Sequence, residues 1–165
     1  MLHLHVLGAG RSVGQSCLVV ETPTDAVMLD CGLNPMRLAD AFTAATLLPF
    51  RAKLRAVIVS HVHVDPVGML PLVTRLCPVP VFASPPTAAA LGPVLRDAHK
   101  TSGLADAHDI DRCVAALRPT PLHRPTPIAR DITFEFALAG HTVGAVMTVL
   151  TVGRTVLLYT GDFDT

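Results

Sequence analysis

The chain has 165 residues, of which 50% are hydrophobic and 16% are charged, and its 13 Lys and Arg balance its 13 Asp and Glu. This length predicts one domain with a sizeable core, and the composition excludes an intrinsically disordered chain. A formal net charge of zero provides no long-range attraction to nucleic acid or to an anionic membrane, which leaves only a local basic patch open.

The sequence carries no membrane or secretion signal. No apolar stretch reaches the ~18 residues of a membrane span, and the N-terminus has no basic region followed by an apolar core. The cysteines are scattered and form no CxxC pair: Cys17, Cys31, Cys77 and Cys113. We therefore expect reduced, mostly buried thiols in a cytoplasmic protein that does not enter a membrane.

The first third of the chain is predicted to be mostly strands. Apolar runs bounded by glycine or turn residues occupy residues 2–7, 16–22, 26–30 and 55–60. The turn sequence Pro23-Thr24-Asp25 predicts a hairpin between the second and third runs. Residues 34–50 are less regular and favour short helical turns. The run at 55–60 is apolar throughout, which predicts a strand buried on both faces.

The middle of the chain is predicted to be helical and the last third to return to strands. Helices are expected at residues 68–76, 86–101 and 109–117, around a brief strand at 80–84. Four prolines between residues 118 and 127 predict an extended connection. Strands are expected at 132–138, 146–152 and 155–159. This order predicts a layered α/β domain whose sheet is covered by helices.

Ligand-type side chains follow the buried strand at residues 55–60. His61, His63 and Asp65 alternate at a spacing of two, so an extended backbone would turn them to one side. Imidazole nitrogens and carboxylate oxygens suit zinc. A half-exposed strand end with polar residues is the alternative, but three such residues in five positions favour a metal site.

Two more residues of this kind follow later strands. His141 lies between Gly140 and Gly144, and Asp162 follows Gly161. Like the first three residues, both lie beyond the carboxyl ends of predicted strands, where open α/β sheets build their sites. The sequence therefore predicts a metal centre built from His61, His63, Asp65, His141 and Asp162.

Five segments together carry a family resemblance: LGAGRSVGQSCLVVE, MLDCG, SHVHVDPVGMLPL, LAGHTVGA and LLYTGDF. They resemble the metallo-β-lactamase fold hydrolases, and more narrowly the RNA-processing branch with the cleavage-and-polyadenylation and Integrator endonucleases and ribonuclease J. The resemblance implies an α/β fold of the αββα sandwich type. It also implies that residues 1–165 are a single domain, the N-terminal part of that fold, without its C-terminal portion and clamping domain. The exposed sheet edge then predicts a homo-oligomer or a partner subunit that completes the fold.

The resemblance also implies metal ligands. His61, His63 and His141 would hold one zinc ion, and Asp162 would bridge two metals. Asp65 would belong to the second metal, but Pro66 stands where the family motif has a histidine. Two carboxylates bind zinc weakly, and proline should push Asp65 toward extended backbone. We therefore expect one zinc site and a broken second site.

These residues predict a metal-dependent hydrolase, by resemblance a ribonuclease that acts in RNA processing. A metal-activated water would attack the phosphodiester, with Asp65 and Asp162 as the catalytic carboxylates and Asp65 as general base. Pro66 should impair this activity. Two alternatives stay open: a non-catalytic member of the family that acts as a binding or partner subunit, and a hydrolase of small esters or thioesters.

Overall fold

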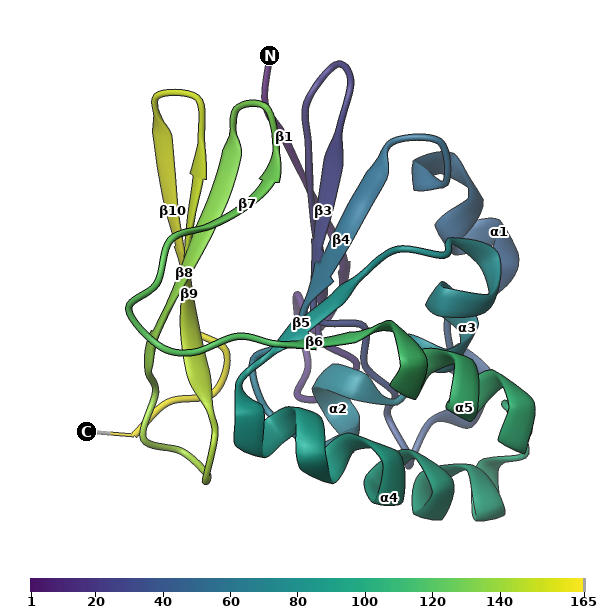
Figure 1. The fold of residues 1–165 in the computed structure, drawn as a ribbon. Coiled ribbons are helices and arrows are strands. Elements are labelled where there is room, and N and C mark those ends of the chain that lie inside the picture. The colour runs from purple at the N-terminus through teal and green to yellow at the C-terminus, as the bar shows by residue number, and fades with distance from the viewer. Residues whose placement is uncertain (165) are drawn as a thin grey trace.

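Two sheets stacked face to face form the centre of the computed structural model, which describes residues 1–164 (Figure 1). The first sheet has the order β1-β2-β3-β4-β5-β6, with bounds His3–Gly8, Cys17–Glu21, Ala26–Leu29, Leu54–Ile58, Val81–Ala83 and Leu117–Pro119. The second has the order β10-β9-β8-β7, with bounds Thr155–Tyr159, Val146–Val152, Ile132–Leu138 and Thr126–Ala129. The first sheet is antiparallel through β3 and parallel from β3 to β6.

The helices lie together on one side of the first sheet (Figure 1). They are α1 (Ala44–Leu47), α2 (Val64–Val67), α3 (Leu70–Leu76), α4 (Pro85–Ser102) and α5 (Ala107–Ala116), with short 3-10 turns at Leu38–Asp40 and Leu48–Phe50. Ser84 caps the start of α4 and Gly103, with φ 65°, ends it, as expected for a serine and a glycine at these positions. None of the helices in the described part of the chain is long and apolar enough to cross a membrane.

The alternation of side chains along the strands creates two cores. In β4, Val57 packs with the helices, whereas Ile58 packs between the sheets. Phe134 and Phe136 of β8 fill the space between the sheets, with ring centroids 5.0 Å apart. The prediction that the run at 55–60 is buried on both faces is therefore confirmed for β4.

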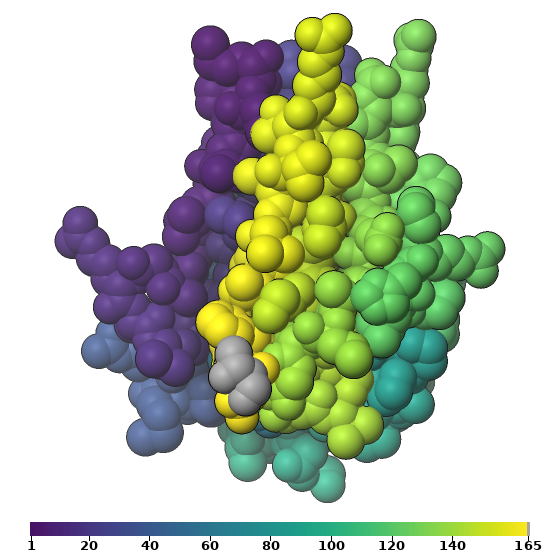
Figure 2. Space-filling view, turned by 90° about the vertical axis from the view of Figure 1, so that its left-hand side faces the viewer, coloured from purple at the N-terminus to yellow at the C-terminus, as the bar shows by residue number. Residues whose placement is uncertain are grey.

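The outer face of the second sheet carries no helix among residues 1–164, so the described part has three layers: helices, sheet and sheet. Val156 and Leu158 of β10 are 62% and 61% exposed on this face. β10 is an edge strand, and so is β1 of the first sheet. Figure 2 shows these two edges next to each other on one side of the molecule.

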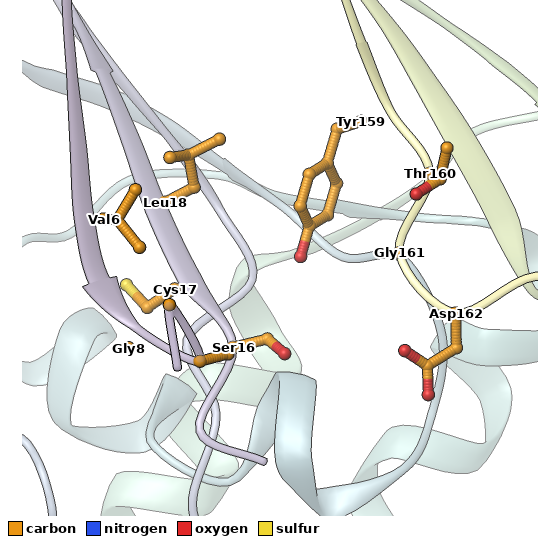
Figure 3. Close-up of a pocket in the computed structure, with 11 residues that line it drawn as sticks. Val6, Gly8, Ser16, Cys17, Leu18, Tyr159, Thr160, Gly161 and Asp162 are labelled. Atoms are coloured by element: carbon orange, nitrogen blue, oxygen red, sulfur yellow. The ribbon is translucent and has the colours of Figure 1, made fainter. Parts of the chain in front are cut away.

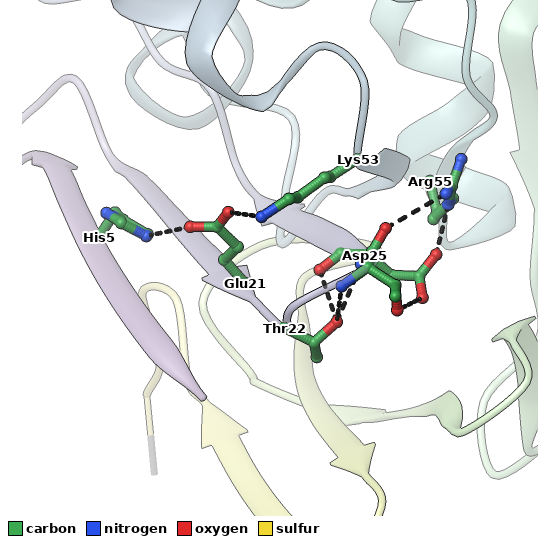
Figure 4. A network of polar contacts seen from close by, with 7 residues as sticks. His5, Glu21, Thr22, Asp25, Lys53 and Arg55 are labelled. Atoms are coloured by element: carbon green, nitrogen blue, oxygen red, sulfur yellow. Dashed lines mark hydrogen bonds and ion pairs between the residues drawn. The ribbon is translucent and has the colours of Figure 1, made fainter. Parts of the chain in front are cut away.

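Ion pairs join the β2–β3 hairpin to the start of β4 (Figure 4). Glu21 bonds both Lys53, at 2.6 Å, and His5, at 2.8 Å, and Arg55 pairs with Asp25. The hydrogen bonds from Lys53 and then His5 lower the pKa of Glu21. These contacts lie at the turn end of the hairpin and link it to β1 and to the start of β4.

Two strands were absent from the sequence-based expectation. The predicted extended connection at 118–127 contributes β6 and β7, one at the edge of each sheet. Pro119 and Pro127 lie within these strands. Proline lacks an N–H group, which excludes it from central strands but not from an edge. Pro119 and Pro127 therefore indicate edge strands, not a connection without strand pairing.

Candidate metal centre

Three imidazoles converge at one end of the two sheets. His61 follows β4, His63 is the residue before α2, and His141 lies in the loop between β8 and β9. The ring centroids lie 4.9, 4.9 and 5.1 Å apart, and His141 Nε2 lies 3.2 Å from His63 Nδ1. One ring nitrogen from each residue lies within 4.8 Å of those of the other two. This is a compact set of three nitrogen ligands.

Asp162 brings a carboxylate to the same place from the end of β10. Its Oδ2 lies 3.9 Å from His61 Nε2 and 3.7 Å from His141 Nε2. The approach depends on Gly161, which has φ 53°, because a Cβ there would lie 2.6 Å from the Cβ of Ser60. The backbone N–H of Val146 also donates to the Ser60 carbonyl at 2.8 Å, so the two sheets are joined beside His61.

The backbone of Asp65 differs from the predicted conformation. The expectation of extended backbone before Pro66 is wrong, because Asp65 lies in the first turn of α2. Proline is tolerated there since the first N–H groups of a helix have no partner within it. The carbonyls of Asp65 and Pro66 accept from the N–H groups of Ser16 and Cys31, which holds the turn in place. Asp65, His61 and Asp162 still offer ligand atoms within 4.8 Å of one another.

The environment of His61 fits a divalent metal. The residue is 2% exposed, and its Nε2 is buried without a hydrogen-bond partner among the described residues. Burial lowers the pKa of His61, and so do His63 and His141, whereas Asp65 and Asp162 oppose this shift. The neutral imidazole thus favoured is the form that binds metal. A buried nitrogen left unpaired is costly, and a metal ion would satisfy it.

A buried carboxylate lies behind His61. Asp30 accepts hydrogen bonds from the Ser60 N–H at 2.8 Å, the Ser60 hydroxyl at 2.7 Å and the Tyr159 hydroxyl at 2.7 Å. Burial raises the pKa of Asp30 to about 7 against the effect of these donors. Ser60 Oγ also lies 3.0 Å from His61 Nδ1. Because the serine gives its hydrogen to Asp30, it accepts from Nδ1–H, which leaves the Nε2 lone pair for a ligand.

Sequence reasoning identified the five ligand-type residues but not this support. Asp30 and Ser60 are neighbours in the fold although they are far apart in the chain, and Tyr159 comes from the other sheet. The one available signal was that Asp30 and Ser60 each end a predicted strand, next to where the ligand-type residues begin.

A pocket of about 260 Å³ opens next to the site (Figure 3). Val6 and Leu18 line it from the first sheet, and Tyr159 projects into it from β10. Asp162 lies at its lower rim. The pocket therefore connects the open edges β1 and β10 with the carboxylate of the candidate metal centre.

Comparison with known proteins identifies relatives of this chain. Residues 10–164 match the family model described as the metallo-beta-lactamase superfamily. The chain is 30% identical to an Integrator complex subunit 11 homolog of Dictyostelium discoideum, over 96% of this chain and 23% of that protein. It is 33% identical to the transcription termination factor FttA of Methanocaldococcus jannaschii, over 98% of this chain and 27% of that protein. It is 30% identical to cleavage and polyadenylation specificity factor subunit 3-II of Arabidopsis thaliana, over 96% of this chain and 28% of that protein.

Solved structures support the fold. A metallo-β-lactamase of Cronobacter sakazakii with a HARLDQ motif aligns with a TM-score of 0.64 at 19% identity, over 98% of this chain and 59% of that chain. The Rm3 metallo-β-lactamase also aligns with a TM-score of 0.64, at 23% identity, over 94% of this chain and 56% of that chain. The chain spans about a quarter of the length of the curated relatives. The expected family and fold are confirmed: the chain belongs to the metallo-β-lactamase superfamily.

Proposed function

We propose that this chain carries the metal-dependent centre of a hydrolase that cleaves RNA phosphodiester bonds. The observation that carries the proposal is the unpaired, buried Nε2 of His61 facing the imidazoles of His63 and His141. The names of the relatives support RNA as the substrate, because they refer to cleavage and polyadenylation, the Integrator complex and transcription termination.

In this proposal His61, His63 and His141 hold a zinc ion, with Asp162 as a fourth ligand. Zinc would act as a Lewis acid and lower the pKa of a bound water. Asp65 is half-buried beside His61 and is placed to accept the proton of the attacking water as general base. Ser60 and Asp30 keep the Nε2 of His61 deprotonated for binding.

We further propose that the chain binds one zinc ion rather than two. The second group of ligand atoms comes from His61, Asp65 and Asp162, and His61 already belongs to the first group. A second cation would therefore depend on two carboxylates, which hold zinc weakly. Pro66, the next residue, has no ligand atom.

A second candidate function follows from Pro66. If one metal is not enough for turnover, the chain would bind RNA or a partner protein without cleaving it. Such a partner, or a second copy of the chain, would cover the exposed side chains of β10, Val156 and Leu158. We also propose a cytoplasmic location, because all four cysteines are buried free thiols.

The test combines metal content with cleavage. Purified wild type should contain about one zinc per chain by elemental analysis, and His63→Ala should lose most of it. The control is His108→Ala, since His108 is exposed on α5 outside the ligand groups. Wild type should cleave a model RNA in preference to a thioester substrate. Equal zinc content in wild type and His63→Ala would refute the proposed metal centre. A wild type that binds zinc but does not cleave RNA would support the non-catalytic function.

A further inference from the structure

The loop that carries the third imidazole contacts the start of α4. His61 and His63 come from one short segment after β4, but His141 comes from the β8–β9 loop of the second sheet. In that loop the carbonyl of Gly144 accepts two side-chain hydrogen bonds, from Ser84 Oγ at 2.6 Å and from Thr87 Oγ1 at 3.0 Å. Both donors lie at the start of α4, directly after β5 of the first sheet.

We propose that Ser84 and Thr87 are positioning residues that hold His141 in the imidazole triad. The proposal rests on the proposed metal centre, since it assigns these hydroxyls a role through one of its ligands. They touch neither the metal position nor the reacting atoms, and they act through the backbone of the loop.

The start of α4 is a firm support for such a contact. Ser84 and Thr87 are 2% and 1% exposed, so solvent does not compete for their hydroxyls. The helix has 18 residues and buries Leu91 and Leu95 completely in the core under the first sheet. Ser84 Oγ also accepts the Thr87 N–H at 3.4 Å as the helix cap. The two donors therefore have a fixed position relative to His61 and His63.

Gly144 allows the loop to come this close. Its φ is 88°, a conformation that side chains with a Cβ rarely adopt. A Cβ at this position would lie 2.9 Å from the Pro86 Cβ, from Ser84 Oγ and from the Thr87 nitrogen. The loop therefore fits against α4 only with glycine at position 144.

The position of Gly144 is transmitted to His141 through a short, closed loop. The Ala145 N–H donates to the Thr142 carbonyl at 2.9 Å, and the Ala139 N–H donates to the Ala145 carbonyl at 3.2 Å. A shift of Gly144 therefore moves the residues from 139 to 145 together. His141 Nε2, 3.2 Å from His63 Nδ1, would leave the triad with them.

The two donors differ in a way that separates positioning from stability. Ser84→Ala removes the cap of α4 as well as the bond to Gly144, so it destabilises the helix in any case. Thr87→Val keeps the cap, the shape and the burial, and removes only the hydroxyl. Thr74→Val is the matched control, because Thr74 is 1% exposed and its hydroxyl also donates to backbone carbonyls, those of Leu70 and Pro71.

The experiment measures amide hydrogen exchange in the metal-free protein and zinc affinity by competition with a chelating dye. Thr87→Val should weaken zinc binding about 10-fold and the Ser84→Ala/Thr87→Val double variant about 100-fold, the range for residues that orient metal ligands. The amide exchange rates of Ala145 and Val146 should rise in Thr87→Val and rise further in the double variant. Thr74→Val should lower the Tm but change neither readout.

Two results would overturn the proposal. The first is a double variant in which the amides of Ala145 and Val146 exchange as slowly as in wild type. The second is a Thr87→Val variant with a lower Tm but unchanged zinc affinity. If wild type itself binds no zinc, the proposed function fails, and the exchange data alone decide this inference: faster exchange confined to the loop supports it, and unchanged exchange refutes it.

Discussion

The two sheets supply the candidate metal centre in different ways. The first sheet contributes His61, His63 and Asp65 from a single segment, and His61 is 2% exposed above the buried Asp30. The second contributes His141 and Asp162 from two loops, and their side chains are 29% and 52% exposed. Within the first half His61 is built into the core, while His63 is exposed and Asp65 is half-buried; both ligands of the second half reach the site from loops. The buried His61 should therefore contribute more to metal affinity than the half-exposed His141.

The largest expected effect comes from removing one imidazole from each half. The free energy of binding zinc at a site with four protein ligands is about 10–16 kcal/mol, which is about 2.5–4 kcal/mol for each ligand. The loss in His61→Ala should lie at the upper end of this range. Its Kd for zinc should rise roughly 1,000-fold, because its buried site leaves little room for a replacement ligand. For His141→Ala the Kd for zinc should rise by nearer 100-fold, because water can reach its half-exposed position. Chelator competition on the two variants measures both values, and equal losses would contradict the proposed difference between the buried and the half-exposed imidazole.

Sequence patterns identified most strands and all of the ligand-type residues in this comparison. The apolar runs that became β2, β3, β4 and β8–β10 are long or alternating, and each candidate ligand follows one of them. The patterns missed the proline-containing edges β6 and β7 and the short α2, where tertiary contacts outweigh local preference.

The residues that support the ligands were beyond such reasoning. Tyr159 lies 129 residues from Asp30, and Ser84 lies 60 residues from Gly144. Their hydrogen bonds exist only after the sheets have packed. Local patterns therefore place a ligand at the end of its strand, but they cannot reveal which distant hydroxyl or carboxylate will orient it.

The second prediction concerns Asp30, the buried support of the first half. Its folded pKa of about 7 exceeds the value of 3.8 expected in the unfolded chain, so the folded protein keeps a proton that the unfolded chain releases. The free energy of unfolding contributed by Asp30 should therefore fall as pH rises across this range, by about 1.4 kcal/mol per pH unit. Asp30→Asn removes this slope. Urea unfolding of the metal-free wild type and variant at several pH values gives the difference.

A half-buried carboxylate, Asp25, gives the control with the opposite sign. The hydrogen bonds from Thr24 and Arg55 lower the pKa of Asp25. Its contribution to stability is therefore present above its unfolded pKa and is lost as pH falls through the folded pKa. The difference between wild type and Asp25→Asn should grow with pH below about 3.8 and stay level above it, whereas that between wild type and Asp30→Asn should shrink between about 3.8 and 7. Parallel curves for the two variants would show that burial does not dominate the titration of Asp30.

The smallest expected effect concerns Pro66, where the first half lacks a ligand. Asp65 is already helical beside the proline, so Pro66→His changes the ligand set rather than the backbone of Asp65. An added imidazole next to Asp65 should raise the metal content from about one toward two per chain, with weak occupancy because two carboxylates contribute most of that site.

Pro66→Ala is the control, since it removes the ring without adding a ligand. Both substitutions should change the free energy of unfolding by about 0.4–1 kcal/mol. Elemental analysis and RNA cleavage by both variants decide the outcome: a gain in metal or rate confined to Pro66→His makes Pro66 the residue that limits the centre, whereas no gain in either variant favours the non-catalytic function.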